Sequence, residues 1–274
     1  MSLNLNEVVR LLAAGKIPSP RLEARILLEN AGGSPYAEVS GAAEEKLRRQ
    51  IERRLAHTPL DKLLGCREFY KNSFVVSEDV LTPRPDTEIL VEAAIELVQQ
   101  NDFAKILDLG TGSGCILLSI LDDCPATQGT AVDASEPALD IARRNASLLG
   151  LSERISFVHG SWFEDGFLQK TGSGFDMIVS NPPYIPTADI ASLEPEVREH
   201  DPLSALDGGA DGFVHYKKIA AWAPLLLNDG GYILLEAGIG QARQILKVFA
   251  DTGLTPVDIL PDLSGTERCV ILKK

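Results

Sequence analysis

From residue 104 onward, segments typical of strands alternate with segments typical of helices. The predicted strands span residues 105–109, 129–133, 155–158, 176–180, 232–236, 255–259 and 268–272. The predicted helices span residues 114–121, 137–149, 214–227 and 241–252. This alternation predicts a parallel sheet that is covered by helices on both faces. The loop between the last two strands is too short to hold a crossover helix, so we expect the final strand to be antiparallel.

The first 63 residues lack this alternation and predict a small all-helical domain. The predicted helices span residues 7–14, with Asn6 as the N-terminal cap, residues 21–31 and residues 42–57. The third helix has an apolar face and an opposite face that carries Arg48, Arg49, Arg53 and Arg54. An arginine face of this kind is typical of a solvated helix surface, but it also fits a contact surface for a macromolecular partner.

Residues 64–82 connect the two regions. Two short β-like runs, 67–70 and 73–76, predict a β-hairpin within this linker. We therefore expect three parts: a helical domain of residues 1–63, the hairpin linker, and an α/β domain of residues 83–274.

Acidic side chains are concentrated in the C-terminal part of the chain. Residues 1–80 carry 12 Lys and Arg against 11 Asp and Glu, whereas residues 81–274 carry 14 against 28. Because nucleic-acid binding is driven mainly by basic side chains on the phosphate backbone, this distribution disfavours a nucleic-acid substrate. It does not exclude one, since a local basic patch is compatible with a negative total.

Neither the cysteines nor the histidines show the spacing of a metal site. The four cysteines form no CxxC pair, which predicts reduced thiols in the cytoplasm. The four histidines are scattered, so we expect no metal. No apolar run reaches the roughly 18 residues of a membrane span, and the first residues have no signal-peptide pattern. We expect a cytoplasmic protein without a membrane segment, and a monomer by default.

A glycine-rich loop, Gly110-Thr111-Gly112-Ser113-Gly114, follows the first predicted strand of the sheet. Glycines there allow a tight turn and a close approach of a ligand to the backbone. Asp133 ends the next strand, where a carboxylate can accept both hydroxyls of a ribose. Asp108, just before the loop, suits the cationic amino-acid end of S-adenosylmethionine better than a pyrophosphate, which it would repel. Trp162 is placed either to pack near an adenine or to fill the core.

The segment Asn181-Pro182-Pro183-Tyr184 follows the fourth predicted strand of the sheet. Its two prolines leave two consecutive backbone positions without an N–H. The Pro182 carbonyl and the side-chain carbonyl of Asn181 thus form a rigid pair of acceptors beside an aromatic face. A planar NH2 group offers two donors in one plane, so the segment predicts a site for a planar nitrogen nucleophile. We expect Asn181 to border the cofactor as well.

Three segments occur together in the order and spacing of a known family: PRPDTE at 83–88, DLGTGSG at 108–114 and NPPY at 181–184. Together they resemble the release-factor glutamine methyltransferases of the HemK/PrmC family, and the resemblance covers nearly the whole chain. The segments ALDGGADG at 205–212 and GTER at 265–268 add to it.

The chain departs from the family pattern at two places. Asp86 stands where the family usually has a glutamate, and DKLLG at 61–65 stands where many members carry a QYILG-like run. Neither position belongs to the expected chemistry.

The resemblance implies a seven-stranded, Rossmann-like methyltransferase sheet with its last strand antiparallel, and a helical N-terminal domain that helps to hold the substrate. It implies that S-adenosylmethionine gives its methyl group to the glutamine amide in the Gly-Gly-Gln loop of peptide chain release factors and leaves as S-adenosylhomocysteine. Asn181 and Pro182 are the expected catalytic residues, which accept the two amide hydrogens. Pro183 and Tyr184 complete the expected substrate site.

Two other functions fit parts of the sequence. Adenine and guanine amino-methyltransferases share the NPPY segment, so an enzyme that acts on adenine in nucleic acid is an alternative, although the acidic C-terminal part counts against it. A methyltransferase-like protein that binds a translation factor without catalysis is a second alternative. A dehydrogenase is disfavoured, because the NPPY segment would have no role in it.

Overall fold

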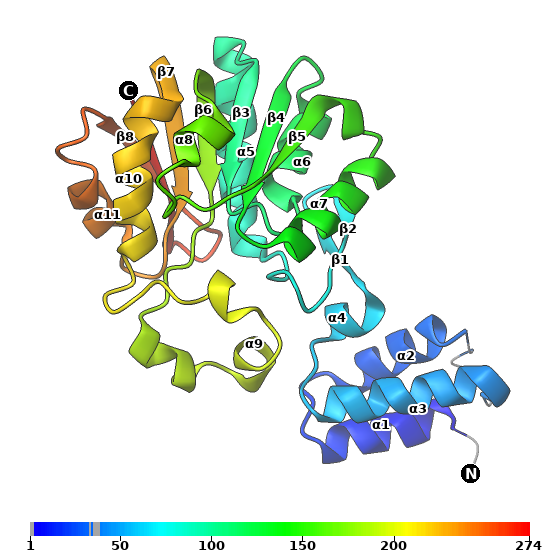
Figure 1. The fold of residues 1–274 in the computed structure, drawn as a ribbon. Helices are drawn as coiled ribbons and strands as arrows, with labels where there is room; N and C mark the ends of the chain where they lie inside the picture. Colours follow the sequence, from blue (N-terminus) through cyan, green and yellow to red (C-terminus); the bar gives the residue numbers. More distant parts are fainter. Residues whose placement is uncertain (1–2, 33, 35–38) are drawn as a thin grey trace. The chain divides into compact units, whose positions relative to one another are not determined.

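The computed structural model describes residues 3–32, 34 and 39–274 (Figure 1). Its main feature is a sheet of seven strands, namely β3 (Lys105–Leu109), β4 (Gln128–Asp133), β5 (Ile155–His159), β6 (Phe175–Ser180), β7 (Leu227–Glu236), β8 (Thr255–Pro261) and β9 (Glu267–Lys273). Their order is β5-β4-β3-β6-β7-β9-β8. Neighbours from β5 to β7 are parallel, and β9 is antiparallel to both β7 and β8. The predicted seven-stranded sheet with an antiparallel last strand is confirmed.

Helices cover both faces of the sheet. They are α5 (Glu88–Asn101), α6 (Cys115–Asp123), α7 (Glu136–Leu148), α8 (Phe167–Thr171), α10 (Val214–Leu226) and α11 (Ala242–Val248). Successive side chains of a strand point to opposite faces. Accordingly, Ile106 belongs to the core that includes Leu90 of α5 and Leu117 of α6, whereas Leu107 belongs to the core that includes Ile219 of α10. Burial on both faces explains why these strands read as nearly continuous apolar runs.

Short helical turns and a hairpin complete this part of the chain. The turns are η1 (Pro85–Thr87), η2 (Ser152–Arg154), η3 (Thr187–Ser192) and η4 (Leu203–Ala205), and the hairpin strands are β1 (Cys66–Phe69) and β2 (Asn72–Val75). Neither α8 nor η3 and η4 has a clear sequence signal, because each has six residues or fewer. Within the described residues, no helix is long and apolar enough to cross a bilayer.

The strand order reverses between β3 and β6, and this reversal places the site. The chain proceeds from β3 to β4 and β5 on one side, then returns to β6 on the other side. Leu109 lies opposite Ser180 at the carboxyl ends of these two strands, and the buried Ser180 hydroxyl donates to the Leu109 carbonyl at 2.6 Å. The loops that follow the two strands therefore begin side by side, at the position where open α/β sheets bind ligands.

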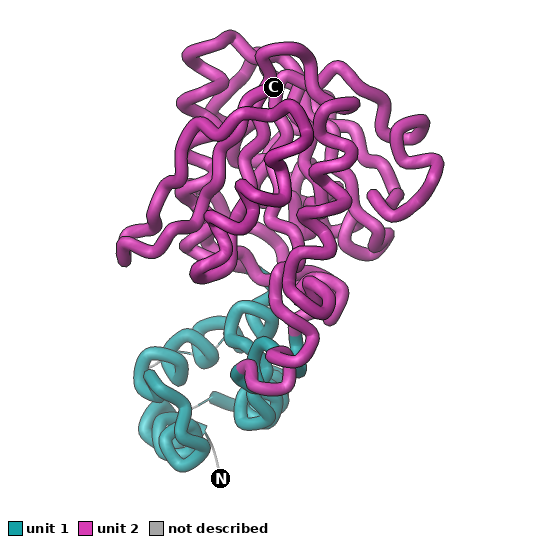
Figure 2. The backbone as a smooth tube through the Cα atoms, turned by 90° about the vertical axis from the view of Figure 1, so that its left-hand side faces the viewer, with its two compact units in different colours: residues 1–66, 194–200 teal, residues 67–193, 201–274 magenta. Residues whose placement is uncertain are grey.

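The structure divides into two compact units (Figure 2). One comprises residues 1–66 together with residues 194–200, and the other comprises the rest. The first unit contains α1 (Leu5–Ala14), α2 (Pro20–Asn30), α3 (Gly41–Leu55), α4 (Leu60–Leu64) and α9 (Pro195–Arg198). No sequence pattern indicates that residues 194–200 belong with the N-terminal helices.

The first helix begins earlier than the sequence predicts. Its N-terminal cap is Asn4, not Asn6: the Asn4 side chain accepts from the Glu7 backbone N–H, and the Glu7 side chain accepts from the Asn4 N–H. This reciprocal capping box satisfies two backbone donors that the first turn of a helix otherwise leaves without partners. Asn6 lies within the first turn instead.

Arg54 is an exception to the predicted solvated arginine face of α3. Its side chain is only 3% exposed and lies 2.6 Å from Glu23 and 2.7 Å from Glu196. The two carboxylates come from α2 and α9, so one buried guanidinium joins residues 194–200 to the N-terminal helices. Burial opposes the charge on Arg54, but the two carboxylates outweigh it and raise the pKa of the guanidinium.

Replacing Arg54 with Met should destabilise the helical unit by about 3–5 kcal/mol, because the change leaves the Glu23 carboxylate buried without its partner. Hydrogen exchange of the α2 and α3 amides in the full chain, followed as denaturant is added, measures this loss. Arg48→Met is the matched control, since Arg48 makes an exposed pair with Glu44 one turn away, and such pairs contribute about 0.3–0.5 kcal/mol. Equal effects of the two changes would contradict the assignment.

Candidate active site

A cavity of about 280 Å³ lies beyond the carboxyl ends of β3, β4 and β6. Its volume is near the lower end of the range for small-molecule sites. Its lining includes most of the predicted cofactor residues, namely Gly110, Thr111, Gly112, Ser113, Asp133, Trp162 and Asn181. Gly114 lies outside the lining, because its Cα faces Leu118 and Ala142 of the adjoining helices.

The glycine loop turns sharply because all three of its glycines adopt left-handed backbone angles. Gly110 has a φ of 75°, and a Cβ there would lie 3.3 Å from the Trp162 ring. Gly112 has a φ of 53°, and a Cβ there would meet no atom within 4 Å. The Gly112 backbone therefore faces the cavity directly, which allows a ligand to approach the main chain.

Asp133 holds this loop in place from the end of β4. Its Oδ2 accepts from the Gly112 N–H at 2.8 Å, and its Oδ1 accepts from the Ser135 N–H at 2.9 Å. Burial raises the pKa of the Asp133 carboxyl, while these backbone donors favour its charged form. Each carboxylate oxygen has a further lone pair, so Asp133 can accept ligand hydroxyls without releasing the loop.

Trp162 forms one wall of the cavity and is fixed from behind. Its indole N–H donates to His215 Nδ1 at 3.2 Å, and the other ring nitrogen of His215 lies 3.1 Å from the Asp207 carbonyl. His215 therefore carries its proton on Nε2 and is neutral, in line with a pKa that burial lowers. Trp162 is 7% exposed, so it both lines the cavity and packs against the core.

The NPPY segment contributes to the same cavity unevenly. Asn181 and Pro183 line it, whereas Pro182 and Tyr184, both of which the structure describes, are not among the lining residues. The Tyr184 hydroxyl instead lies 3.5 Å from a carboxylate oxygen of Glu236, at the end of β7. Burial raises the pKa of Tyr184, so the phenol stays protonated and acts as a donor.

The chain after NPPY is held by the ALDGGADG segment. Ile185 donates to the Leu206 carbonyl at 3.0 Å, and Gly208 donates back to the Ile185 carbonyl at 2.8 Å. A Cβ on Gly208 would lie 2.7 Å from the carbonyl carbon of Tyr184. A Cβ on Gly212 would lie 2.6 Å from the backbone carbonyl oxygen of Tyr184. Glycine is needed at both places because the two backbones touch.

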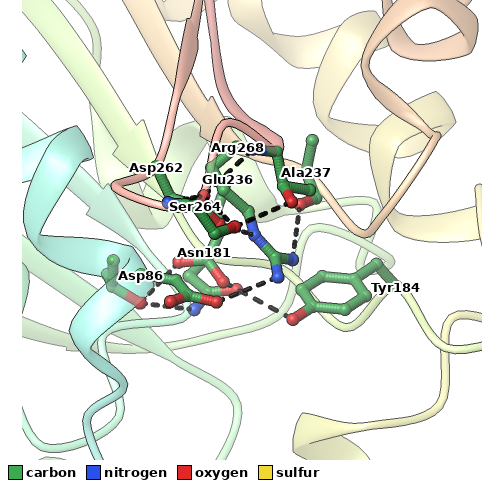
Figure 3. A network of polar contacts seen from close by, with 10 residues as sticks. Asp86, Asn181, Tyr184, Glu236, Ala237, Asp262, Ser264 and Arg268 are labelled. Carbon is green, nitrogen blue, oxygen red and sulfur yellow. Dashed lines mark hydrogen bonds and ion pairs between the residues drawn. The ribbon is translucent and has the colours of Figure 1, made fainter.

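A polar network lies behind the NPPY segment (Figure 3). Arg268 of β9 pairs with Asp86 at 2.9 Å and with Asp262 at 3.0 Å. Asp86, which departs from the family's usual glutamate, is therefore long enough to reach this guanidinium. The PRPDTE and GTER segments, far apart in the sequence, meet in this network.

Several lining residues were missed by the sequence reasoning. They are Asp79, Val80, Leu81, Thr82, Pro83, Arg84, Thr87, Cys115, Ile116, Ala134, Ser135, Ala138, Ser161, Phe163, Pro202, Ser204, Ala205 and His215. Pro83, Arg84 and Thr87 belong to the PRPDTE segment, which could have indicated them. Pro202 and Ser204 carry no sequence signal, whereas Ala205 opens the ALDGGADG segment.

These lining residues fit S-adenosylmethionine. The aliphatic and aromatic side chains offer an apolar surface for an adenine. Asp133 offers a carboxylate for ribose hydroxyls, and the open Gly112 backbone allows close contact with the amino-acid end. Asp108, which we expected beside the amino-acid end, is fully buried behind the loop, accepts from the Thr111 hydroxyl at 2.6 Å and does not line the cavity.

Comparisons with known proteins agree with this assignment. The family model "Methyltransferase small domain" matches residues 82–193. The solved structure of the hMettl16 catalytic domain has a TM-score of 0.60 at 16% identity, over 78% of this chain and 80% of that chain. A methyltransferase from Pyrococcus furiosus has a TM-score of 0.51 at 18% identity, over 83% of this chain and 97% of that one. The fold and the cavity define an S-adenosylmethionine-dependent methyltransferase.

Sequence relatives identify the family within this class of methyltransferases. "Release factor glutamine methyltransferase" of Rhodospirillum rubrum is 44% identical over 97% of this chain and 82% of its own length. The protein of the same name from Caulobacter vibrioides is 40% identical over 96% of this chain and 92% of its own length. The family model "PrmC N-terminal domain" matches residues 4–65. The chain belongs to the release factor glutamine methyltransferase family.

Replacing Asp133 with Ala should weaken S-adenosylmethionine binding by about 10- to 100-fold, because charged hydrogen bonds contribute about 1.5–3 kcal/mol. Isothermal titration calorimetry with the cofactor measures this loss. Asp140→Ala is the control: Asp140 also follows β4, but it is exposed on α7 and pairs with Arg143. An unchanged affinity of the Asp133 variant would contradict a role in the cofactor site.

Proposed function

We propose that this protein methylates the side-chain amide nitrogen of the glutamine in the Gly-Gly-Gln loop of peptide chain release factors. The observation that carries the proposal is the position of Asn181, which lines the same cavity as the glycine loop. A side-chain carbonyl at that position can hold an NH2 group beside the methyl donor. The names of the sequence relatives and the acidic C-terminal part favour a protein amide over a nucleic-acid base as the bearer of this group.

The proposed mechanism begins with the weak nucleophilicity of an amide. Bound S-adenosylmethionine supplies an electrophilic methyl group on a positively charged sulfur. Asn181 Oδ1 and the Pro182 carbonyl accept the two amide hydrogens and thereby raise the electron density on nitrogen. These hydrogen bonds strengthen as positive charge develops on that nitrogen, so they favour the transition state over the bound substrate. The methylated nitrogen then loses its proton to water.

Positioning supplies much of the remaining acceleration. Holding a nucleophile in line with its target can contribute up to about 7–11 kcal/mol. Pro183 and Tyr184 would bound the substrate amide plane, and the contact between Tyr184 and the glycines of ALDGGADG keeps this segment rigid. Rigid acceptors need no rearrangement during the reaction.

We place recognition of the release factor in the helical domain of residues 1–63, joined by the hairpin linker of residues 64–82 to the catalytic domain of residues 83–274. The match of residues 4–65 to the family's N-terminal domain supports this division. On α3, Arg48 pairs with Glu44 and Arg49 pairs with Glu45, and both ion pairs lie at the surface. The proposed substrate is a cytoplasmic translation protein, and the enzyme would meet it there as a monomer.

Replacing Asn181 with Ala should lower kcat by about 10²- to 10³-fold, the usual cost of removing one hydrogen-bond group aimed at developing charge. The affinity for S-adenosylmethionine should change much less. Single-turnover methylation and calorimetry separate the two effects. Asn228→Ala is the control, because Asn228 is exposed and lies at the start of β7, away from the cavity. Normal turnover by the Asn181 variant would refute its proposed role.

Incubation with labelled S-adenosylmethionine distinguishes the substrate classes. We expect label on the Gly-Gly-Gln glutamine of a release factor, located by peptide mapping, and none on DNA or RNA. Label on adenine alone would establish the nucleic-acid alternative, because its flipped base presents the same planar NH2 group. Cofactor binding without transfer to any of these would favour a non-catalytic binder.

A further inference from the structure

Glu236 is a carboxylate in the core behind the NPPY segment. It ends β7, next to the end of β6 from which Asn181 extends, and it is 2% exposed. Figure 3 shows it together with Asn181, Tyr184 and Arg268. The family chemistry outlined above gives Glu236 no part, and an ionised carboxylate at such depth needs donors around it.

A hydrogen bond to Glu236 fixes the position of the hydroxyl proton of Thr87, the threonine of PRPDTE. Its hydroxyl lies 2.5 Å from Glu236 Oε2, a short distance of the kind found for hydrogen bonds to charged acceptors. An ionised carboxylate can only accept, so Thr87 must donate. The one hydroxyl proton of Thr87 is thereby used, and its oxygen can offer only lone pairs to any other neighbour.

The other neighbour of the Thr87 hydroxyl is the side-chain amide of Asn181. Asn181 Nδ2 lies 3.5 Å from the Thr87 hydroxyl oxygen. The two ends of an asparagine amide are nearly alike in shape, so its orientation follows from the hydrogen-bond network. Because Thr87 can only accept, the NH2 end must face it. A flipped amide would place two oxygens against each other.

We propose that Thr87 and Glu236 are positioning residues that fix the orientation of the Asn181 side chain, and so keep Oδ1 available to the substrate amide. The inference rests on the proposed function, in which Oδ1 accepts an amide hydrogen. Among the described residues, no donor bonds to Oδ1, which leaves it for the substrate. At 3.5 Å the contact between Asn181 and Thr87 is a weak hydrogen bond.

The network behind Glu236 holds it in the accepting state. The Tyr184 hydroxyl donates to Oε1 at 3.5 Å, and the positive charge of Arg268 favours ionisation. Burial acts in the opposite direction and is the largest influence, so the pKa of Glu236 is raised to about 7. Below that pH, Glu236 is protonated and can itself donate to Thr87. The Thr87 proton is then free to turn toward Asn181, and the amide loses its preferred orientation.

Methylation should therefore decline as the pH falls through about 7. Other titratable or charged groups surround Glu236, namely Asp86, Cys115, Tyr184, Tyr216, Arg268 and Cys269. The pKa of Asp108 is also raised to about 7 by burial, so the pH profile has to be assigned by substitution.

The test compares kcat of the full-length enzyme on a release factor across pH 6–9 for Thr87→Val, Thr87→Ser and Glu236→Gln. Thr87→Val removes the hydroxyl at constant shape. It should lower kcat by about 10- to 100-fold, the cost of an unmatched polar pair at the reacting amide. Thr87→Ser keeps the hydroxyl and should retain most of the rate. Glu236→Gln is neutral at every pH, so its rate should stay near the low-pH rate of the unaltered enzyme.

Calorimetry with S-adenosylmethionine supplies the second readout, and Thr127→Val is the matched control. Thr127 is equally buried, but its hydroxyl donates to the Phe103 carbonyl at the opposite end of the sheet. Thr87 lines the cavity, but valine keeps its shape, so we expect all variants to keep their cofactor affinity. A parallel loss of cofactor affinity and kcat in Thr87→Val would show a merely structural role and overturn the proposal.

The controls separate this inference from the proposed function. If Thr87→Val and Glu236→Gln keep the normal kcat and pH profile while Asn181→Ala is inactive, the positioning inference is wrong and the proposed function stands. If Asn181→Ala keeps its activity, the role of Asn181 fails, and the positioning inference fails with it.

Discussion

The pairing of β3 with β6 is the constraint on which the site depends. It brings the carboxyl ends of two strands together at the point where the strand order reverses, and the hydroxyl of Ser180 fastens one end to the Leu109 carbonyl. The glycine loop leaves from one strand and the NPPY segment leaves from the other. A methyl donor and a nucleophile can thus share one cavity without any loop having to cross it.

Buried carboxylates give this end of the sheet its electrostatic character. Asp108, Asp133 and Glu236 end three different strands or lie close to their ends, and burial raises the pKa of each. Such groups cost free energy unless hydrogen bonds or positive charges compensate them. Each has such a partner: the Thr111 hydroxyl, the backbone of Gly112 and Ser135, and the Thr87 hydroxyl. A cationic cofactor beside them would be favoured by the same charges.

The sequence predicts what local patterns determine and misses what distant contacts determine. The seven strands could be placed because apolar β-branched runs alternate with helical periodicity, and the glycine loop because its backbone angles demand glycine. Residues 194–200 could not be placed, since their association with the helical unit depends on the buried guanidinium of Arg54. Pro202 and Ser204, which line the cavity, could not be placed either, because no local pattern marks them.

The polar network gives a physical reason for motifs other than NPPY. PRPDTE supplies Thr87 and Asp86, GTER supplies Arg268, and the end of β7 supplies Glu236, so three distant segments converge behind Asn181. An asparagine by itself has no preferred amide orientation, and the two prolines that follow it fix the backbone but not the side chain. A directional chain of donors, ending at a buried carboxylate, can supply that missing preference. On the proposed function, the hold of NPPY on a planar NH2 group then depends on residues that lie outside the motif, and a substitution among them would alter catalysis while the cofactor site stays intact.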